Sequence, residues 1–185
     1  MGKITLLLGG ARSGKSFYAQ EEAKKVKKVL FVATAEAGDA DMRRRIRKHK
    51  EERPANWHTL EATTHIGHQI EDTIDDEELV IIDCITLLVT NILCQIDEKD
   101  FDTCDESLLE KRVYAEINEL RDCLKKVDVD FIIVCNEVGL GIVPDNRISR
   151  IYRDLLGRAN QMLAASADEV YLMVAGIPLR VKPQK

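Results

Sequence analysis

Five short runs of consecutive apolar residues occur along the chain, and the segments between them carry apolar residues at every third or fourth position. Continuous apolar runs of this length are typical of β-strands that are covered on both faces. The runs are KITLLLG (3–9), KVLFVATA (28–35), ELVIIDC (78–84), DFIIVCN (130–136) and EVYLMVAG (169–176). A shorter run, GIPLRVK (176–182), predicts a final antiparallel strand turned by Gly176 and Pro178.

Three of the intervening segments have the apolar spacing of amphipathic helices. The strongest stripe spans 107–127, a second spans 148–163, and a weaker one spans 66–74. Strands that alternate with helices imply a mostly parallel sheet with right-handed crossovers and helices on both faces. We therefore predict a single α/β domain over residues 1–185, with an antiparallel C-terminal strand.

Composition, charge and cysteine usage narrow the class of protein. The 185 residues are 45% hydrophobic and 32% charged, which is ordinary for a globular domain. A net charge of −5 gives no global attraction to nucleic acid, so any anion site must be local. The longest apolar stretch (84–96) is shorter than the roughly 20 residues that span a bilayer, so we expect no membrane insertion. The five scattered cysteines, never spaced as CxxC, favour a reducing cytoplasm.

The segment LLLGGARSGKS (6–16) contains the pattern G-x-x-x-x-G-K-S between an apolar run and a helical segment. In this context glycines let backbone N–H groups turn toward phosphate oxygens beside the positive end of a helix. Lys15 would reach the β and γ phosphates, and the Ser16 hydroxyl would bind Mg²⁺. A plain glycine turn is the alternative. The predicted cradle comprises Gly9, Gly10, Ala11, Arg12, Ser13, Gly14, Lys15 and Ser16.

An acidic residue, Asp83, ends the third apolar run. In P-loop enzymes a carboxylate at a strand end meets the magnesium ion. Taken alone, an acid at a strand end is as often a helix cap. Together with Ser16, it predicts a metal or nucleotide contact.

The segment MRRRIRKHKEERP (42–54) is strongly basic and contains one histidine, His49. Gly38-Asp39 before it and Pro54 after it bracket a helix of about 14 residues. One broad face of that helix would carry Met42, Arg45, Ile46, His49, Lys50 and Arg53, of which Met42 and Ile46 would be packed. The remaining cations, which we expect to be solvated, are Arg43, Arg44, Arg47 and Lys48.

Two interpretations of His49 remain open. Nearby cations disfavour imidazolium, so we expect a depressed pKa and a largely neutral ring at pH 7. A neutral imidazole can attack phosphorus, and the same cations would hold phosphate oxygens. The alternative is a helix histidine without a chemical role. The other histidines have no comparable setting, and we interpret His58, His65 and His68 as structural or exposed.

Four blocks of the chain resemble the bifunctional adenosylcobinamide kinase/adenosylcobinamide-phosphate guanylyltransferase family of cobalamin biosynthesis. They are GGARSGKS (9–16), VATAEAGDADMRRRIRKHKEERPANWHTLEA (32–62), IIDCITLLVTN (81–91) and CNEVGLGIVPDNRISRIYRDLLGRANQMLAASADEVYLMVAGIPLRVK (135–182). The similarity keeps the same order over nearly the whole chain, and only the region around 96–106 matches loosely. It implies a P-loop NTPase (RecA-like) domain.

The resemblance implies two reactions. ATP or GTP first phosphorylates a hydroxyl of adenosylcobinamide. GTP then guanylylates an enzyme histidine with loss of pyrophosphate, and GMP passes to adenosylcobinamide phosphate to give adenosylcobinamide-GDP. The family's nucleophile precedes Lys in H-K-x-x-R-P, which here is His49. Many relatives carry a His-His pair where this chain has Lys48 before His49.

The resemblance also implies a set of nucleotide contacts and partners. Besides the cradle, the contacts would come from Ala33, Thr34, Ala35, Lys50, Glu51, Glu52, Arg53, Glu61 and Asp83, with Mg²⁺ on Ser16 and Asp83. Partners would be adenosylcobinamide, its phosphate and GTP or ATP, with no nucleic acid, and the chain would form a homo-oligomer, a trimer in relatives. The loop of 136–147 either meets the corrinoid or guanine, through Asn136, Glu137 or Arg147, or only closes a helix start at Asp145.

Two other functions remain open from the sequence. One is a monofunctional P-loop small-molecule kinase in which the basic helix clamps phosphates without a covalent step. The other is a RecA-like ATPase that acts on nucleic acid. The acidic composition and the lack of interleaved aromatic and basic residues weigh against the second.

Overall fold

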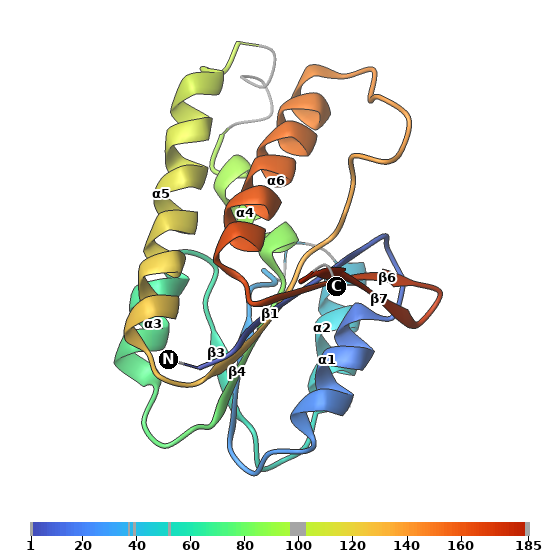
Figure 1. The fold of residues 1–185 in the computed structure, drawn as a ribbon. Helices are drawn as coiled ribbons and strands as arrows, with labels where there is room; N and C mark the ends of the chain where they lie inside the picture. The colour runs from blue at the N-terminus through green and yellow to red at the C-terminus, as the bar shows by residue number, and fades with distance from the viewer. Residues whose placement is uncertain (1, 37, 39, 52, 97–102, 184–185) are drawn as a thin grey trace.

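The computed structural model describes residues 2–36, 38, 40–51, 53–96 and 103–183, and in the basic helix it does not describe the side chains of 41, 42, 45, 48 and 49. Figure 1 shows strands and helices alternating along the chain. The elements are β1 (Ile4–Gly9), α1 (Lys15–Ala23), β2 (Val29–Ala33), α2 (Ala40–Glu51), β3 (His58–Glu61), α3 (Ile66–Thr73), β4 (Leu79–Asp83), α4 (Ile85–Leu93), α5 (Glu106–Lys126), β5 (Asp130–Val134), α6 (Arg147–Ser166), β6 (Glu169–Val174) and β7 (Ile177–Lys182).

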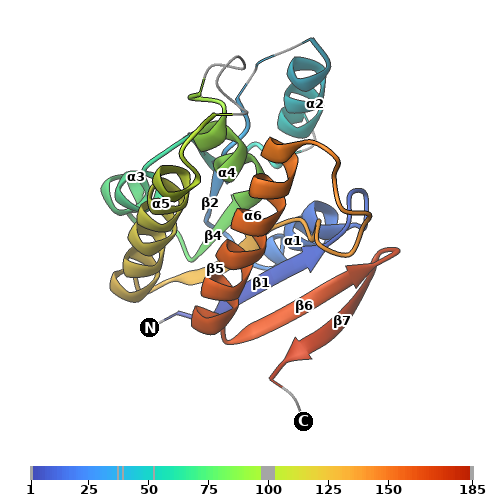
Figure 2. The ribbon, with the colours of Figure 1, turned by 90° about the horizontal axis from the view of Figure 1, so that it is seen from above.

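One sheet runs through the molecule in the order β3-β2-β4-β5-β1-β6-β7. All pairings are parallel except β6 with β7, which is antiparallel. The predicted α/β fold, with a mostly parallel sheet and an antiparallel C-terminal strand, is therefore confirmed. The order places β1 and β4 on either side of β5, so the loops after β1, β2 and β4 meet at one edge of the sheet (Figure 2).

Each face of the sheet has its own apolar core, because successive side chains of a strand point to opposite faces. On β2, Leu30 and Val32 pack with the apolar stripes of α3, α4, α5 and α6. Val29 and Phe31 of the same strand pack with Ala19 and Ala23 of α1 on the other face. Helix α2 stands apart from both layers, beyond the sheet edge where the site is built (Figure 2).

Two elements were absent from the sequence predictions. β3 is a four-residue edge strand whose side chains are mostly exposed, so the sequence has no apolar run there that would predict a strand. α4 lies within the apolar stretch of 84–96, for which the sequence predicts only that it is too short to span a bilayer. The side chains of α4 are nearly all buried. Among the described residues, no helix is both long and apolar enough to cross a bilayer.

The predicted helix bounds need small corrections. α2 has 12 residues, against the 14 or so that the flanking Gly-Asp and Pro suggested. α6 begins at Arg147, and its cap is Asn146 rather than Asp145, because the Asn146 side chain accepts a hydrogen bond from the Ser149 amide at 2.8 Å. The region of 96–106, which matches the family loosely, falls mostly on 97–102, outside the described residues.

Candidate active site

The glycine-rich loop joins β1 to α1 in a conformation that requires glycine. Gly14, the residue before α1, has a φ of +95°, which L side chains rarely adopt. A Cβ atom at Gly9 would lie 2.6 Å from the Met173 carbonyl oxygen on β6. The loop is also tied to the β6–β7 turn, where the Gly176 amide donates to the Ser13 carbonyl at 2.9 Å. The backbone is thus held in the shape that wraps an anion at the start of α1.

Lys15 is buried beneath this loop. Its ammonium donates to the carbonyl oxygens of Gly9 at 2.9 Å and Gly10 at 2.7 Å, and lies 3.4 Å from the Ser13 hydroxyl. Burial lowers the pKa of Lys15, although the nearby acidic groups, including Asp83, oppose the shift. The ammonium is therefore held against the loop rather than extended into solvent.

A cleft of about 790 Å³ opens above the loop. It is bounded by the P-loop, the ends of β2, β3 and β4, and the inner face of α2. Its lining comprises Ala11, Arg12, Ser13, Gly14, Lys15, Ser16, Phe17, Phe31, Ala33, Ala35, Glu36, Ile46, Lys50, Arg53, Glu61, Thr63, Asp83, Cys84, Thr86, Leu87, Val134 and Asn136.

Arg53, just after α2, is held on an aromatic platform inside the cleft. Its guanidinium carbon lies 3.8 Å from the centre of the Phe31 ring, and Phe31 in turn stacks on Trp57 with ring centres 6.2 Å apart. Its Nε is buried without a hydrogen-bond partner among the described residues. Burial lowers the pKa of Arg53 despite the opposing charges of Asp83 and Glu61. A desolvated cation with an unused donor is suited to an anionic ligand.

Helix α2 is joined to the sheet by an ion pair. Lys50 binds the Glu61 carboxylate at the end of β3, and both side chains line the cleft. Ile46, one turn earlier, lines the same cleft. His49 lies in α2 directly before Lys50, but its side chain is outside the described set, so its orientation and pKa stay predictions.

Buried polar side chains fix the strand ends around the cleft. The Thr34 hydroxyl accepts from the Cys84 amide at 2.8 Å and donates to the Cys84 carbonyl at 2.7 Å, which joins the end of β2 to the residue after Asp83. The Asn91 amide donates to the carbonyls of Thr34 and Thr63 at 2.9 and 3.0 Å. These bonds set the positions of the ends of β2, β3 and β4 relative to one another.

Most of the residues predicted for the site are brought together in the cleft. They are Ala11, Arg12, Ser13, Gly14, Lys15, Ser16, Ala33, Ala35, Lys50, Arg53, Glu61 and Asp83. Four predicted residues do not line it: Gly9 and Gly10, whose carbonyls accept from Lys15, the fully buried Thr34 and the exposed Glu51. Glu52 is outside the described residues. Of the cations expected to be solvated, Arg43, Arg44 and Arg47 are exposed.

The chain has clear relatives among known proteins. A family model described as "Cobinamide kinase / cobinamide phosphate guanyltransferase" matches residues 5–181. The chain belongs to this family, CobU.

The curated relatives match over nearly their full length. The chain is 40% identical to the "Bifunctional adenosylcobalamin biosynthesis protein CobU" of Escherichia coli over 97% of this chain and 99% of the relative. The protein of the same name from Salmonella typhimurium matches to the same extent. CobP of Pseudomonas aeruginosa is 38% identical over 96% of each chain. Among solved structures, the RadB recombinase has a TM-score of 0.51 at 15% identity, covering 92% of this chain and 74% of that one. This likeness supports the P-loop NTPase fold.

In this CobU-family chain, several cleft residues were missed by the sequence reasoning. Phe31 on β2 and Thr63 after β3 are two of them. Thr86 and Leu87, in the first turn of α4, are two more. At such positions an apolar or small polar residue looks like core. Cys84 also lines the cleft, and burial, with the charge of Asp83 beside it, raises the pKa of its thiol to about 11. That thiol is protonated at neutral pH and is a poor nucleophile.

The candidate residues of the loop after β5 do not all line the cleft. Asn136 lines the cleft, and its backbone is held by the Thr86 hydroxyl at 2.8 Å and the Asn160 amide at 3.1 Å. Arg147 instead turns to Cys104, donating to its carbonyl at 3.1 Å. Of the three loop candidates, only Asn136 therefore lines the cleft.

Proposed function

We propose that this chain phosphorylates adenosylcobinamide and then transfers GMP from GTP to adenosylcobinamide phosphate through a guanylylated His49. The observation that carries the proposal is that α2 and the P-loop line one cleft, through Ile46 and Lys50 on one side and the 11–16 loop on the other. A triphosphate in the loop would therefore lie beneath the helix that bears His49. Family membership supplies the two activities.

In the kinase step, a hydroxyl oxygen of adenosylcobinamide attacks the γ-phosphorus of ATP or GTP. A new O–P bond forms, the bond to the nucleoside diphosphate breaks, and the hydroxyl proton is released. Backbone N–H groups of the loop and the Lys15 ammonium hold the phosphate oxygens. The same groups stabilise the charge that develops on them.

In the guanylyl step, a ring nitrogen of His49 attacks the α-phosphorus of GTP. The N–P bond forms as the bond to pyrophosphate breaks. A phosphate oxygen of adenosylcobinamide phosphate then attacks the same phosphorus, which breaks the N–P bond and gives the diphosphate product. Lys50 and Arg53 would bind the phosphate oxygens on the α2 side of the cleft, with Lys50 leaving Glu61 when the anion arrives.

The cleft contains both residues that the sequence predicts as magnesium ligands. Ser16 and Asp83 both line the cleft and offer a hydroxyl and a carboxylate oxygen, the hard ligands that Mg²⁺ prefers. When bound, Mg²⁺ would neutralise charge on the phosphates. On this proposal Ser16 and Asp83 are its protein ligands.

The experiment is to incubate the protein with GTP labelled on the α-phosphate and Mg²⁺, then to measure acid-labile, base-stable label on the chain. We expect stoichiometric labelling of the wild type and none of His49→Ala. His58→Ala is the matched control, because His58 is an exposed histidine paired with Glu77 and should label fully. Labelling of His49→Ala would refute the nucleophile. Absence of label in the wild type with kinase activity intact would leave a monofunctional kinase.

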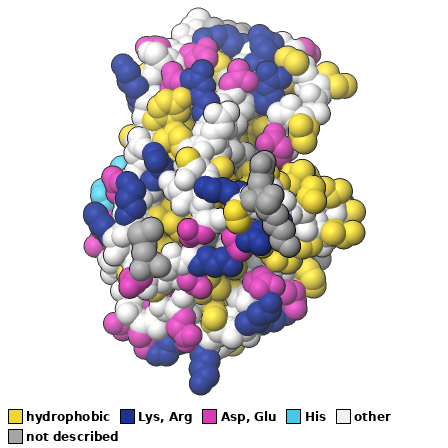
Figure 3. Space-filling model, viewed as in Figure 1, with side chains coloured by type: hydrophobic (Ala, Val, Ile, Leu, Met, Phe, Trp, Pro, Cys, Tyr) yellow, Lys and Arg dark blue, Asp and Glu magenta, His cyan; other side chains and the backbone are white. Residues whose placement is uncertain are grey.

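We also infer a homo-oligomer, a trimer by family resemblance. Exposed apolar side chains gather at one end of the molecule, on the right of Figure 3, over the loop after β5 and the β6–β7 hairpin. They are Leu140, Ile142, Val143, Val174, Ile177, Leu179 and Val181. An apolar patch of this kind marks an interaction site. Sedimentation equilibrium tests the state, and a monomer at micromolar concentration would refute it.

We infer that residues 1–185 act as one nucleotide-binding and transferase unit in the cytoplasm, without nucleic acid as a partner. Free thiols on all five cysteines suit a reducing compartment. ATP hydrolysis that rises on addition of nucleic acid would contradict this part.

A further inference from the structure

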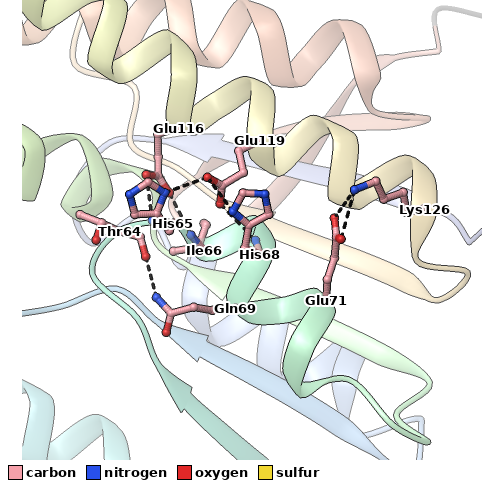
Figure 4. Close-up of polar contacts among 9 residues, drawn as sticks. All are labelled: Thr64, His65, Ile66, His68, Gln69, Glu71, Glu116, Glu119 and Lys126. Atoms are coloured by element: carbon pink, nitrogen blue, oxygen red, sulfur yellow. Dashed lines mark hydrogen bonds and ion pairs between the residues drawn. The ribbon is translucent and has the colours of Figure 1, made fainter.

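The start of α3 is held against α5 by two carboxylates. Glu116, which is buried, accepts hydrogen bonds from the amides of His65 and Ile66, both at 2.9 Å. Glu119, about one turn later on α5, accepts from the His68 amide at 3.1 Å through Oε1 (Figure 4). These bonds fix the backbone that carries both histidines. His65 itself has a positive φ of 49°.

Both imidazoles converge on the second oxygen of Glu119. Nδ1 of His65 lies 2.9 Å from Glu119 Oε2, and Nδ1 of His68 lies 3.3 Å from the same atom (Figure 4). The two rings are nearly parallel, with an interplanar angle of 10° and centres 6.4 Å apart. One ligand atom from each of the three residues lies within 4.8 Å of the other two.

We propose that His65, His68 and Glu119 form a zinc-class metal site that clamps α3 to α5. Zinc binds histidine nitrogen and carboxylate oxygen at about 2.0–2.2 Å, so tetrahedral ligands lie roughly 3.3 Å apart. The two nitrogen-to-oxygen distances, 2.9 and 3.3 Å, already fall near that value. A metal ion would replace these nitrogen–oxygen contacts with only small movements of the side chains.

The donor set selects the class of metal. Two imidazoles with one carboxylate suit Zn²⁺ and its neighbours among the divalent transition metals, whereas Mg²⁺ and Ca²⁺ prefer oxygen ligands alone. The histidine side chains are 71% and 65% exposed, so a metal ion has a path in and water can fill the fourth position. The bond from the His68 amide to Glu119 Oε1 supplies the orienting contact that metal-binding carboxylates usually have.

The site is separate from the nucleotide cleft, since none of its three ligands lines that cleft. It is nevertheless close in sequence to the end of β3, because Thr63 in the cleft lining precedes His65 by two residues. A metal on His65 would therefore steady the segment that leads from the cleft to α3. The ordinary alternative is a histidine–carboxylate ion pair without a metal, as His58 and Glu77 form at 2.9 Å.

The test compares Zn²⁺ binding by the wild type, His65→Gln, His68→Gln and the matched control His58→Gln, all freed of metal with a chelator. Binding is measured by competition with a chromophoric zinc indicator. We expect one site in the wild type and in His58→Gln, and at least about tenfold weaker binding in either cluster variant. Co²⁺ bound at the site should show d–d bands without a thiolate charge-transfer band, which separates it from sites on cysteine.

The clamp is tested by thermal unfolding of the same four proteins. At a Zn²⁺ concentration a hundredfold above the wild-type Kd, the Tm of the wild type and of His58→Gln should rise by roughly 5–10 °C, and that of the cluster variants should rise by no more than about half as much. Cooperative unfolding of all four proteins in chelator, with Tm differences small beside the shift that Zn²⁺ causes in the wild type, would show that all four fold alike. Zn²⁺ binding unchanged in His65→Gln and His68→Gln overturns the site. Binding without a rise in Tm overturns the clamp. Neither result bears on the guanylylation of His49.

Discussion

The guanidinium carbon of Arg53 lies 3.8 Å above the centre of the Phe31 ring, at the floor of the cleft that the P-loop and α2 share. Lysine at this position would keep the charge but lose the planar stack and the fork of donors. We therefore expect Arg53→Lys to raise the KM for GTP by about tenfold, since a stack of this kind is worth about 1–2 kcal/mol when desolvated. Steady-state guanylyl transfer measures it.

The matched variant for this prediction is Phe31→Leu, which leaves Arg53 in place without its platform. If the stack positions the guanidinium, both variants should raise the KM for GTP. An Arg53→Lys enzyme with unchanged KM, beside a Phe31→Leu enzyme with raised KM, would show that Phe31 acts on the nucleotide by itself.

Thr34 connects two strand ends through one hydroxyl. Valine there would leave the Cys84 amide buried without its acceptor, because the two bonds at 2.7 and 2.8 Å would be lost. We expect Thr34→Val to lower the free energy of unfolding by about 1–3 kcal/mol. Urea denaturation measures this. Thr59→Val, at an exposed position of β3, should stay within about 0.5 kcal/mol of the wild type. A Thr34→Val protein as stable as Thr59→Val would contradict the role.

The parts of the fold that the sequence predicts are those in which local pattern and burial agree. Buried parallel strands such as β4 need apolar residues on both faces, so an unbroken apolar run marks them. β3 could not be found this way, because an edge strand with exposed side chains is held by its pairing with β2 rather than by apolar burial. The sheet order, too, depends on contacts between distant segments that no local pattern records.

For the candidate site, too, the sequence predicts the parts that depend on local pattern and not those that depend on contacts between distant segments. The P-loop is readable because Gly14, Lys15 and Ser16 are consecutive and their roles depend on local backbone shape. The aromatic platform of Arg53 cannot be predicted from the sequence, because Phe31 and Arg53 meet only when β2 and the end of α2 are brought together. The same is true of the histidine cluster, since Glu119 comes from a helix some fifty residues away from His65. From the sequence, His65 and His68 are interpreted as structural or exposed, and their spacing gives no sign of a shared carboxylate.

Gly14 offers a test of the loop's backbone. Its φ of +95° and the 3.0 Å approach of Gly176 both oppose a side chain. We expect Gly14→Ala to lower the free energy of unfolding by about 1–3 kcal/mol and to weaken nucleotide binding. Gly157 is the matched control, since it lies inside α6 with no atom within 4 Å of an added Cβ. Gly157→Ala should be neutral or should stabilise the protein by up to about 1 kcal/mol. Equal effects at the two positions would refute the strain argument.

The pair of His65 and Glu119 makes a prediction about pH in the absence of metal. The hydrogen bond to Glu119 raises the pKa of His65 above its ordinary value of 6.5. Burial acts to raise the pKa of Glu119, but the bonds from His65 and from the His68 amide outweigh it and lower that pKa below 4.5. Glu116 and His68 are the other titratable groups that face the pair.

The signs of the two shifts define a window of pH. A raised histidine pKa stabilises the folded state fully below 6.5, and this contribution is lost as the pH rises through the folded-state pKa. A lowered carboxyl pKa stabilises it above 4.5, and this is lost as the pH falls through the folded-state pKa. In chelator, the stability difference between wild type and His65→Gln should therefore be largest between about pH 4.5 and 6.5, and should shrink toward pH 9. Urea midpoints of both proteins across this range measure it, and a difference that grows above pH 7 would show that the pair does not carry it.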